Sequence, residues 1–109
     1  LARVHAKAEF LKLLNWRMAW KTDQGTLTPA DASAGKVFGS ENDIECYKLL
    51  LEVIGRAGML QKGSPGAELG GAIEHAYRSA PVRTFGGGSN EVQREILVQT
   101  ALGLPRGAR

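Results

Sequence analysis

The sequence predicts an all-α fold, and specifically an antiparallel four-helix bundle. No segment alternates apolar and polar residues over a sustained length, so no sheet is expected. Apolar residues instead recur at helical spacing in four segments, residues 1–22, 28–55, 67–78 and 89–102. Short connections join these segments, and such connections favour antiparallel neighbours.

The first helix carries a broad apolar stripe that includes Leu11 and Met18. Trp16 and Trp20 share one of its faces, which serves either as core or as a contact with another subunit. The helix is expected to end just before Gly25, because glycine readily takes the left-handed conformation that follows a last turn.

The second helix begins with three clear signals. Thr28 can cap it, Pro29 suits its first position, and Asp31 places a negative charge in its first turn. Gly35 and Gly39 lie inside it, and each costs about 1 kcal/mol relative to alanine. Both are tolerable if a neighbouring helix packs closely against them.

The last two helices are shorter. The third is weakened by glycines at positions 70 and 71, and Pro81 is expected to stop it. The fourth begins at Ser89 or Asn90, and either Gly88 with Glu91 or Ser89 alone caps it. The basic tail, residues 106–109, is expected to be mobile.

Composition excludes several classes of function. A net charge of +3 with mixed signs is too diffuse to predict nucleic-acid binding. Cys46 is the single cysteine, and its position in a helical pattern favours a role as a small apolar residue. The sequence has only two histidines besides, His5 and His75, so no cluster of zinc ligands is expected. No apolar run reaches membrane-spanning length, and a reducing cytoplasm is expected. The chain starts at Leu1 inside a helical pattern, which suggests part of a longer protein.

The stretch at 86–94 concentrates the functional signal. Three consecutive glycines let the backbone take positive φ and let another molecule approach closely. A helix that starts directly afterwards points N–H groups and a positive dipole at whatever lies in front of it, commonly a phosphate. A plain turn between two helices explains the same residues, and on this stretch alone it is the favoured interpretation.

The wider sequence, however, resembles a known family. It reads Gly-Gly-Ser-Asn-Glu-Val-Gln-Arg at 87–94 and Leu-Gly-Leu-Pro-Arg at 102–106, which is similar to the C-terminal signature of acyl-CoA dehydrogenases. Tyr77 and Arg78 match the family's Tyr-Arg-Asp-Ala element, with Ser79 in place of the aspartate. Residues 52–58 loosely fit Gln-Ile-x-Gly-Gly-x-Gly, and residues 1–25 resemble the preceding helix. The resemblance covers the whole chain, and its last motif is specific.

This resemblance implies FAD-dependent α,β-dehydrogenation of an acyl-CoA thioester, in which a glutamate takes the α-proton and the flavin accepts the β-hydrogen as hydride. Residues 1–109 would form the C-terminal helical bundle of a longer flavoprotein, lacking the first helix of the family's bundle. The family assembles as dimers and tetramers that share cofactor sites. An electron-transfer flavoprotein or a similar acceptor would reoxidise the cofactor.

By the same resemblance, residues from two parts of the chain are expected at FAD. Ser89, Asn90 and Glu91 would contact the chain's own flavin, and Gly88 would lie beside the substrate. The flavin of a neighbouring subunit would be approached by a second group, Glu52, Gly55 and Arg56. In this group Glu52 replaces the usual glutamine, which is awkward near a pyrophosphate, and Arg56 replaces a glycine and either contacts phosphate or obstructs it.

The catalytic base is missing from its usual position. Many members carry the glutamate where this chain has Gly87, and glycine cannot abstract a proton. Glu91 and Glu95 are candidates only in principle, because carboxylates in the first turns of a helix are stabilised as anions. The chain alone is therefore expected to be inactive. An alternative is a non-catalytic partner subunit or remnant that assembles with an active dehydrogenase, and a weaker one is an unrelated helical interaction module.

Overall fold

The computed structural model describes residues 1–105, and all the regular secondary structure in these residues is helical, with no strand. The all-α prediction is confirmed. The helices are α1 (Ala2–Asp23), α2 (Pro29–Ile54), α3 (Ala72–Ser79) and α4 (Asn90–Leu102). Three short 3₁₀ segments connect them: η1 (Gly55–Met59), η2 (Glu68–Gly71) and η3 (Ala80–Thr84). The predicted basic tail at 106–109 lies outside the described residues.

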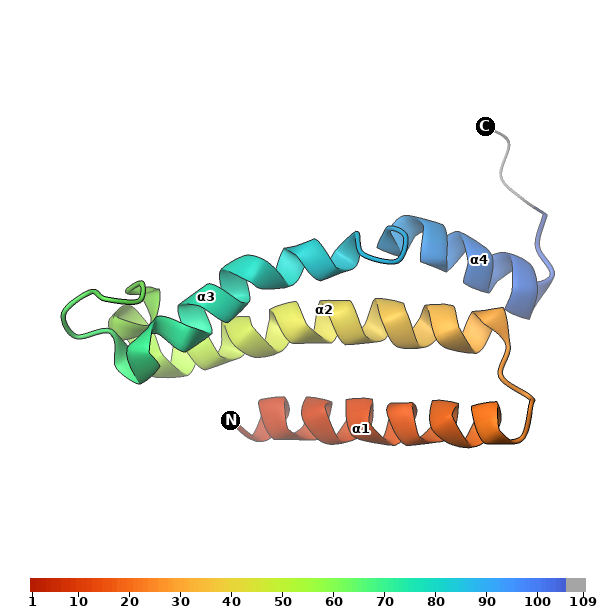
Figure 1. The fold of residues 1–109 in the computed structure, drawn as a ribbon, viewed down its shortest axis with the longest axis horizontal. Coiled ribbons are helices and arrows are strands. Elements are labelled where there is room, and N and C mark those ends of the chain that lie inside the picture. Colours follow the sequence, from red (N-terminus) through yellow and green to blue (C-terminus); the bar gives the residue numbers. More distant parts are fainter. Residues whose placement is uncertain (106–109) are drawn as a thin grey trace.

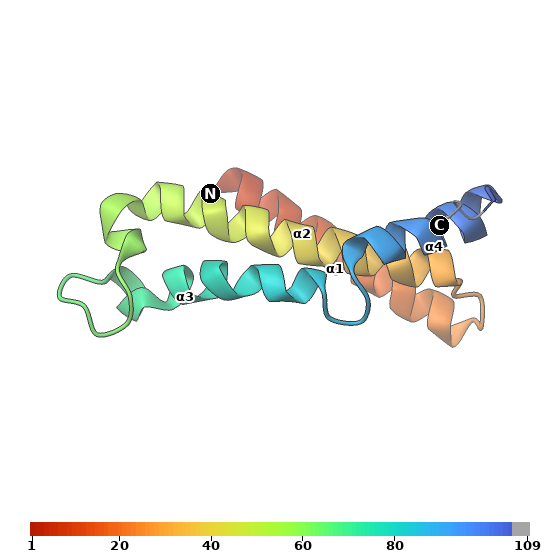
Figure 2. The ribbon, with the colours of Figure 1, turned by 90° about the horizontal axis from the view of Figure 1, so that it is seen from above.

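The long helix α2 runs through the middle of the molecule and contacts every other helix. α1 lies antiparallel along one side of it (Figure 1). α3, η3 and α4 follow one another end to end along another side, also antiparallel to α2 (Figures 1 and 2). The predicted count and direction of the helices are thus confirmed, but α3 and α4 share one layer. The result is an elongated body of 53 × 35 × 20 Å.

The start signals of α2 form as predicted. The Thr28 hydroxyl accepts a hydrogen bond from the Asp31 N–H at 3.2 Å, and the Asp31 carboxylate accepts one from the Thr28 N–H at 3.0 Å. This reciprocal capping box satisfies two N–H groups at the helix start. Gly25, with φ of 64°, takes the predicted left-handed conformation after α1.

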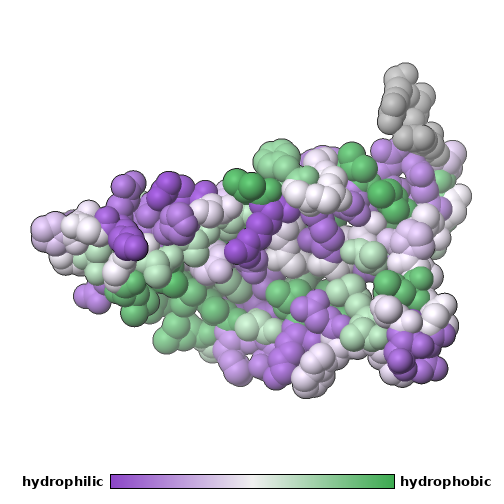
Figure 3. All heavy atoms as spheres, viewed as in Figure 1, coloured by the Kyte–Doolittle hydropathy of each residue, from purple (hydrophilic) through white to green (hydrophobic). Residues whose placement is uncertain are grey.

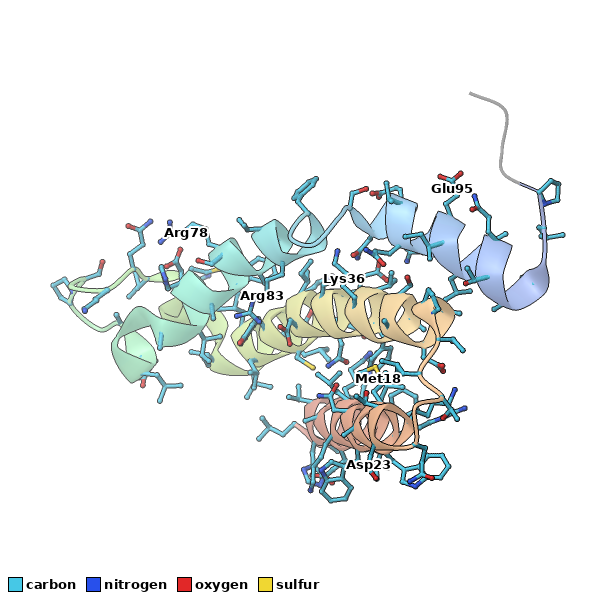
Figure 4. The ribbon with its side chains drawn as sticks, turned by 45° about the vertical axis from the view of Figure 1, so that its right-hand side comes forward. Met18, Asp23, Lys36, Arg78, Arg83 and Glu95 are labelled. Carbon is cyan, nitrogen blue, oxygen red and sulfur yellow. The ribbon has the colours of Figure 1, made fainter. Side chains whose placement is uncertain are left out.

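The two glycines inside α2 allow α1 to approach, as the sequence required. A Cβ at Gly35 would stand 2.5 Å from the Met18 Sδ, and one at Gly39 would stand 3.6 Å from the Leu11 side chain. Figure 4 shows Met18 between the two helices. Ion pairs border this contact at both ends, at Lys7–Glu45 (2.7 Å), Arg3–Glu45 (3.3 Å) and Lys21–Asp31 (2.6 Å).

The third helix differs from its prediction at its start, whereas its end at Ser79 agrees with the predicted end at about residue 78. It begins at Ala72 instead of about residue 67, because Leu69, Gly70 and Gly71 all have positive φ values that no α-helix accepts. The α-helix ends before Pro81, as predicted, but the chain continues as a 3₁₀ segment. Pro81 lies in the first turn of η3, where a residue without an N–H is tolerated, so helical backbone continues to Thr84.

Much apolar surface stays uncovered in residues 1–105. Ala80 is the single apolar residue among them that is buried, and apolar side chains reach the surface in separate patches (Figure 3). Trp16 and Trp20 are each 61% exposed, so they are not core within this part of the chain. α1 carries apolar side chains on the face that packs against α2 and also on the face away from it. The exposed apolar face indicates packing against further protein. In the described residues no helix is long and apolar enough to cross a membrane.

Candidate functional site

The glycine loop, residues 86–89, joins η3 to α4. Gly87 and Gly88 have φ values of 72° and 94°, which side chains strain to adopt. Ser89 is the N-cap of α4, and its hydroxyl accepts a hydrogen bond from the Val92 N–H at 3.5 Å. Of the two predicted caps, the structure therefore selects Ser89 alone. A Cβ at Gly87 would meet nothing within 4 Å, so the loop borders open space.

Lys36 ties this loop to α2. Its ammonium donates hydrogen bonds to the Thr84 carbonyl (2.8 Å), the Gly88 carbonyl (2.8 Å) and the Asn90 side-chain oxygen (2.6 Å). These acceptors lie on both sides of the loop, and Figure 4 shows Lys36 on the side of α2 that faces α4. All three donors of the ammonium are used. Each bond to a charged donor contributes about 1.5–3 kcal/mol.

Sequence reasoning missed Lys36. The only signal was a row of polar residues at helical spacing in the first half of α2, namely Ser33, Lys36 and Ser40. That row now has an explanation, because all three side chains face α4 and its loop.

Asn90 is predicted to contact a cofactor, and the structure places it inside the molecule. It is 3% exposed, and its amide donates to the Ser40 hydroxyl at 3.0 Å and to the Glu41 carboxylate at 3.1 Å. With its oxygen bound to Lys36, the side chain is occupied by contacts to α2. Asn90 therefore positions the start of α4 from within the fold.

Gln93 fixes the other carbonyl of the loop. Its amide donates to the Gly87 carbonyl at 2.7 Å, and its oxygen accepts from the buried Ser33 hydroxyl at 2.7 Å. The Gly87 and Gly88 carbonyls thus face protein donors. Within residues 1–105 the N–H groups of Gly87 and Gly88 have no hydrogen-bond acceptor. The arrangement suits an anionic or acceptor-rich ligand at a helix N-terminus.

Glu91 and Glu95 differ in what surrounds them. Hydrogen bonds from the Glu91 backbone N–H and the Ser89 hydroxyl lower the pKa of the exposed Glu91 carboxyl, in keeping with a first-turn anion. Glu95 accepts from the Gln99 amide at 3.0 Å and points away from α2 in Figure 4. A carboxylate stabilised as its anion is a weak base, so Glu91 is poorly suited to abstract a proton.

The second predicted group lies at the far end of α2. Gly55 ends that helix with φ of 72°, and Glu52 and Arg56 are exposed beside it. They line a groove of about 430 Å³ together with Lys48, Leu51, Met59 and Tyr77. Tyr77 arrives from α3, so two separate motifs meet here. Lys36 and Glu52 are sixteen residues apart on one helix, or about 24 Å. The structure therefore keeps the two predicted groups apart, as expected for contacts with two different flavins.

Several other side chains have structural partners. Arg78 pairs with Glu74 at 2.8 Å, and Arg94 pairs with Glu41 at 2.6 Å, so both arginines form ion pairs within the domain. Burial raises the pKa of the Cys46 thiol, which argues against a reactive thiolate. Among residues 1–105, no three histidine, cysteine, aspartate or glutamate side chains gather to hold a metal ion.

Comparison with known proteins gives one consistent result. Residues 1–102 match the family described as acyl-CoA dehydrogenase, C-terminal domain. The chain is 56% identical to acyl-CoA dehydrogenase FadE26 of Mycobacterium tuberculosis, with 100% of the chain and 28% of the relative covered. It is 35% identical to FadE29 of the same organism, with 97% and 27% covered. The chain thus spans a little over a quarter of the length of these relatives.

Two solved structures agree with this result. The chain resembles one in the ChsE4-ChsE5 complex of Mycobacterium tuberculosis, with 57% identity, a TM-score of 0.89 and 97% of this chain and 27% of that chain covered. It also resembles one in the Tcur3481-Tcur3483 steroid ACAD, with 44% identity, a TM-score of 0.92 and 97% and 28% covered.

Proposed function

The chain belongs to the acyl-CoA dehydrogenase family, and on that premise we propose that it is the C-terminal helical domain of one subunit of a hetero-oligomeric, FAD-dependent acyl-CoA dehydrogenase. The domain contributes to the flavin site, the acyl pocket and a subunit interface. The observation that carries this proposal is the glycine loop at the N-terminus of α4. Hydrogen bonds from Lys36 of α2 and Gln93 of α4 fix its conformation.

The residues present fit a flavin nucleotide. The loop offers N–H groups, a helix N-terminus and a nearby cation, and all three favour an acceptor-rich or anionic group. Ser89 and Glu91 are the residues proposed to contact FAD there, with Asn90 fixing their position from inside and Gly88 beside the substrate. FAD, when bound, supplies the acceptor for the hydride from the β carbon.

The groove at the far end of α2 is proposed to meet the flavin of a neighbouring subunit. Arg56 brings an exposed positive charge, and Gly55 lets the backbone turn at the close of the helix. Glu52 is exposed at the rim, where its carboxylate can stay in solvent. The apolar floor of Leu51, Met59 and Tyr77 suits a flat ring system.

The base for the α-proton lies outside this domain in our proposal. Gly87 occupies the position at which many relatives carry it, and neither Glu91 nor Glu95 replaces it. The glutamate then belongs to an upstream helix of the same protein. The chain alone is expected to be inactive, and the exposed apolar faces of α1 are consistent with assembly.

We further propose a bulky substrate, a steroid-bearing acyl-CoA. A similar structure, at 44% identity, is that of a steroid ACAD. In the present chain, neither Gly86 nor Gly87 brings a side chain to the loop, and a Cβ at either would meet nothing within 4 Å. A pocket wall without side chains leaves room for a large fused-ring acyl group. The proposed electron acceptor is an electron-transfer flavoprotein or a similar protein, and the proposed location is the cytoplasm.

The alternative function is that of a non-catalytic partner subunit. Gly87 favours it, as do the two-component complexes in which the similar chains were solved. The two candidates make different predictions for the upstream region of the full-length protein. A dehydrogenase subunit has a glutamate there whose replacement by glutamine abolishes turnover. A partner subunit has none, and the essential glutamate is then found in its companion.

The test uses the full-length protein co-expressed with its neighbouring subunit. We expect bound flavin in the absorbance spectrum and oxidation of a steroid acyl-CoA with a ferrocenium acceptor. Ser89→Trp should remove flavin from the site at the glycine loop, whereas Thr100→Trp, on the exposed far end of α4, should leave flavin content unchanged. A purified complex without flavin, or a Ser89→Trp complex with full flavin content, would contradict the proposal.

A further inference from the structure

We infer that Lys36 is a positioning residue, whose ammonium sets the conformation of the glycine loop and thereby the placement of the acyl-CoA and flavin contacts. The inference deepens the proposed function and rests on it for the identity of the ligands. The effect on the loop itself does not depend on that identity.

The Lys36 ammonium joins the two ends of the segment 84–88 through hydrogen bonds. The Thr84 and Gly88 carbonyls stand on either side of Phe85 and two glycines, and one ammonium binds both at 2.8 Å. Three successive glycines have more backbone freedom than any other tripeptide, so local sequence cannot hold this loop in one conformation. The restraint has to come from another part of the chain, and α2 supplies it.

The same ammonium links the two proposed contact regions. Gly88, proposed beside the substrate, and Asn90, which fixes the cap of α4 beside the flavin, are both bound to it directly. A displacement of the ammonium therefore shifts both regions together. Its three acceptors are neutral oxygens, with the Glu41 carboxylate reached only through the Asn90 amide. The positive charge adds to the N-terminal dipole of α4 and also acts on Glu91.

A matched control is Lys21, which lies in α1 and contacts α2 on the side away from α4. Lys21 is also half-buried and ties α1 to α2 through Asp31 at 2.6 Å, without touching the glycine loop. Lys36→Met and Lys21→Met each remove one lysine that holds a second element to α2. A role in stability alone predicts the same consequences for both variants.

The experiment compares Lys36→Met, Lys36→Arg and Lys21→Met in the full-length complex with its partner subunit. Hydrogen exchange is measured by mass spectrometry over residues 84–93, and the KM for acyl-CoA, the kcat and the flavin absorbance change on substrate binding are measured alongside. We expect Lys36→Met to speed exchange in this peptide at least tenfold, to raise KM at least tenfold and to alter the absorbance change. Lys21→Met should lower the thermal midpoint without these effects. Lys36→Arg keeps the charge but not the compact three-donor geometry, and should restore the flavin absorbance change more fully than KM.

Unchanged exchange over residues 84–93 in Lys36→Met would overturn the inference, whether or not the protein is a dehydrogenase. Faster exchange with KM and the flavin spectrum within twofold of the natural protein would overturn the positioning role. If Lys36→Met yields no folded protein, the same readouts on Lys36→Arg decide. A natural complex that binds no flavin defeats the proposed function, and the exchange measurement still tests the effect of Lys36 on the loop.

Discussion

The two faces of α2 are built on different physical principles. Toward α1 the helix carries Gly35 and Gly39, and between the ion pairs at its two ends the contact is close steric packing against Met18 and Leu11. Toward α4 it carries Ser33, Lys36 and Ser40, and the contact is a network of hydrogen bonds. The first kind of contact fixes how near two helices lie. The second also fixes where particular backbone atoms of a loop are held, because hydrogen bonds are directional. The face that serves the proposed site is the polar one.

The largest effect on stability is expected on the polar face, from Asn90→Ala. This change removes the hydrogen bonds to Lys36, Ser40 and Glu41 at a position that is 3% exposed. Losing buried bonds to charged groups should cost about 3 kcal/mol in the free energy of unfolding. Urea titration of the full-length protein measures it. The control is Glu91→Ala, one residue along and exposed. Equal losses of unfolding free energy in the two variants would show that the buried network around Asn90 contributes no special stability.

Because the face of α2 toward α1 is closely packed, Gly35→Val should lower the free energy of unfolding, but by less than Asn90→Ala does. Even a Cβ there meets the Met18 side chain at 2.5 Å, and overpacking of this kind costs about 1–3 kcal/mol. Gly39→Ala is the matched control, because its Cβ would stand at an ordinary 3.6 Å from Leu11. That change should raise the free energy of unfolding by up to about 1 kcal/mol through helix propensity. A stabilising Gly35→Val would contradict close packing at this contact.

A double-mutant cycle sharpens the comparison. Ser33→Ala and Gln93→Ala each remove one partner of the 2.7 Å bond between α2 and α4. If directional bonding holds this face, the two changes should couple by about 1 kcal/mol. Unfolding of both single variants and the double variant gives the coupling, and strict additivity would count against the network.

The smallest effect concerns acid stability on the α1 side. Hydrogen bonds from the Lys21 ammonium and from Thr28 hold the pKa of the Asp31 carboxyl well below its ordinary value. The unfolded chain therefore binds this proton more readily, so the contribution of Asp31 is present above about pH 4 and is lost as pH falls further. Asp31→Asn should flatten the fall in thermal midpoint below that pH. Lys21→Met should reproduce most of the flattening, since Lys21 is the main cause of the shift. An unaltered acid profile in both would contradict this account.

Sequence reasoning succeeded where the signals are local and failed where they are not. Thr28, Pro29 and Ser89 marked helix starts correctly, because a cap acts on N–H groups within the next few residues. The start of α3 was missed, because Leu69 takes a left-handed conformation that residues other than glycine rarely adopt. Residues 87–94 pointed to the right family. The predicted contacts with flavin and substrate stay predictions, those with flavin for Ser89, Asn90, Glu91, Glu52, Gly55 and Arg56 and the one with substrate for Gly88.

The sequence by itself determined the helices, the capping residues, the close approach at Gly35 and the family motif around the glycine loop. Only the tertiary structure decided that α3 and α4 run end to end, that Asn90 is buried, and that Lys36 clasps the loop. The physical reason is the distance along the chain over which each interaction acts. Caps and propensities act within a few residues, whereas the acceptors of Lys36 lie 48, 52 and 54 positions away along the chain. Such partners meet only after the helices have packed.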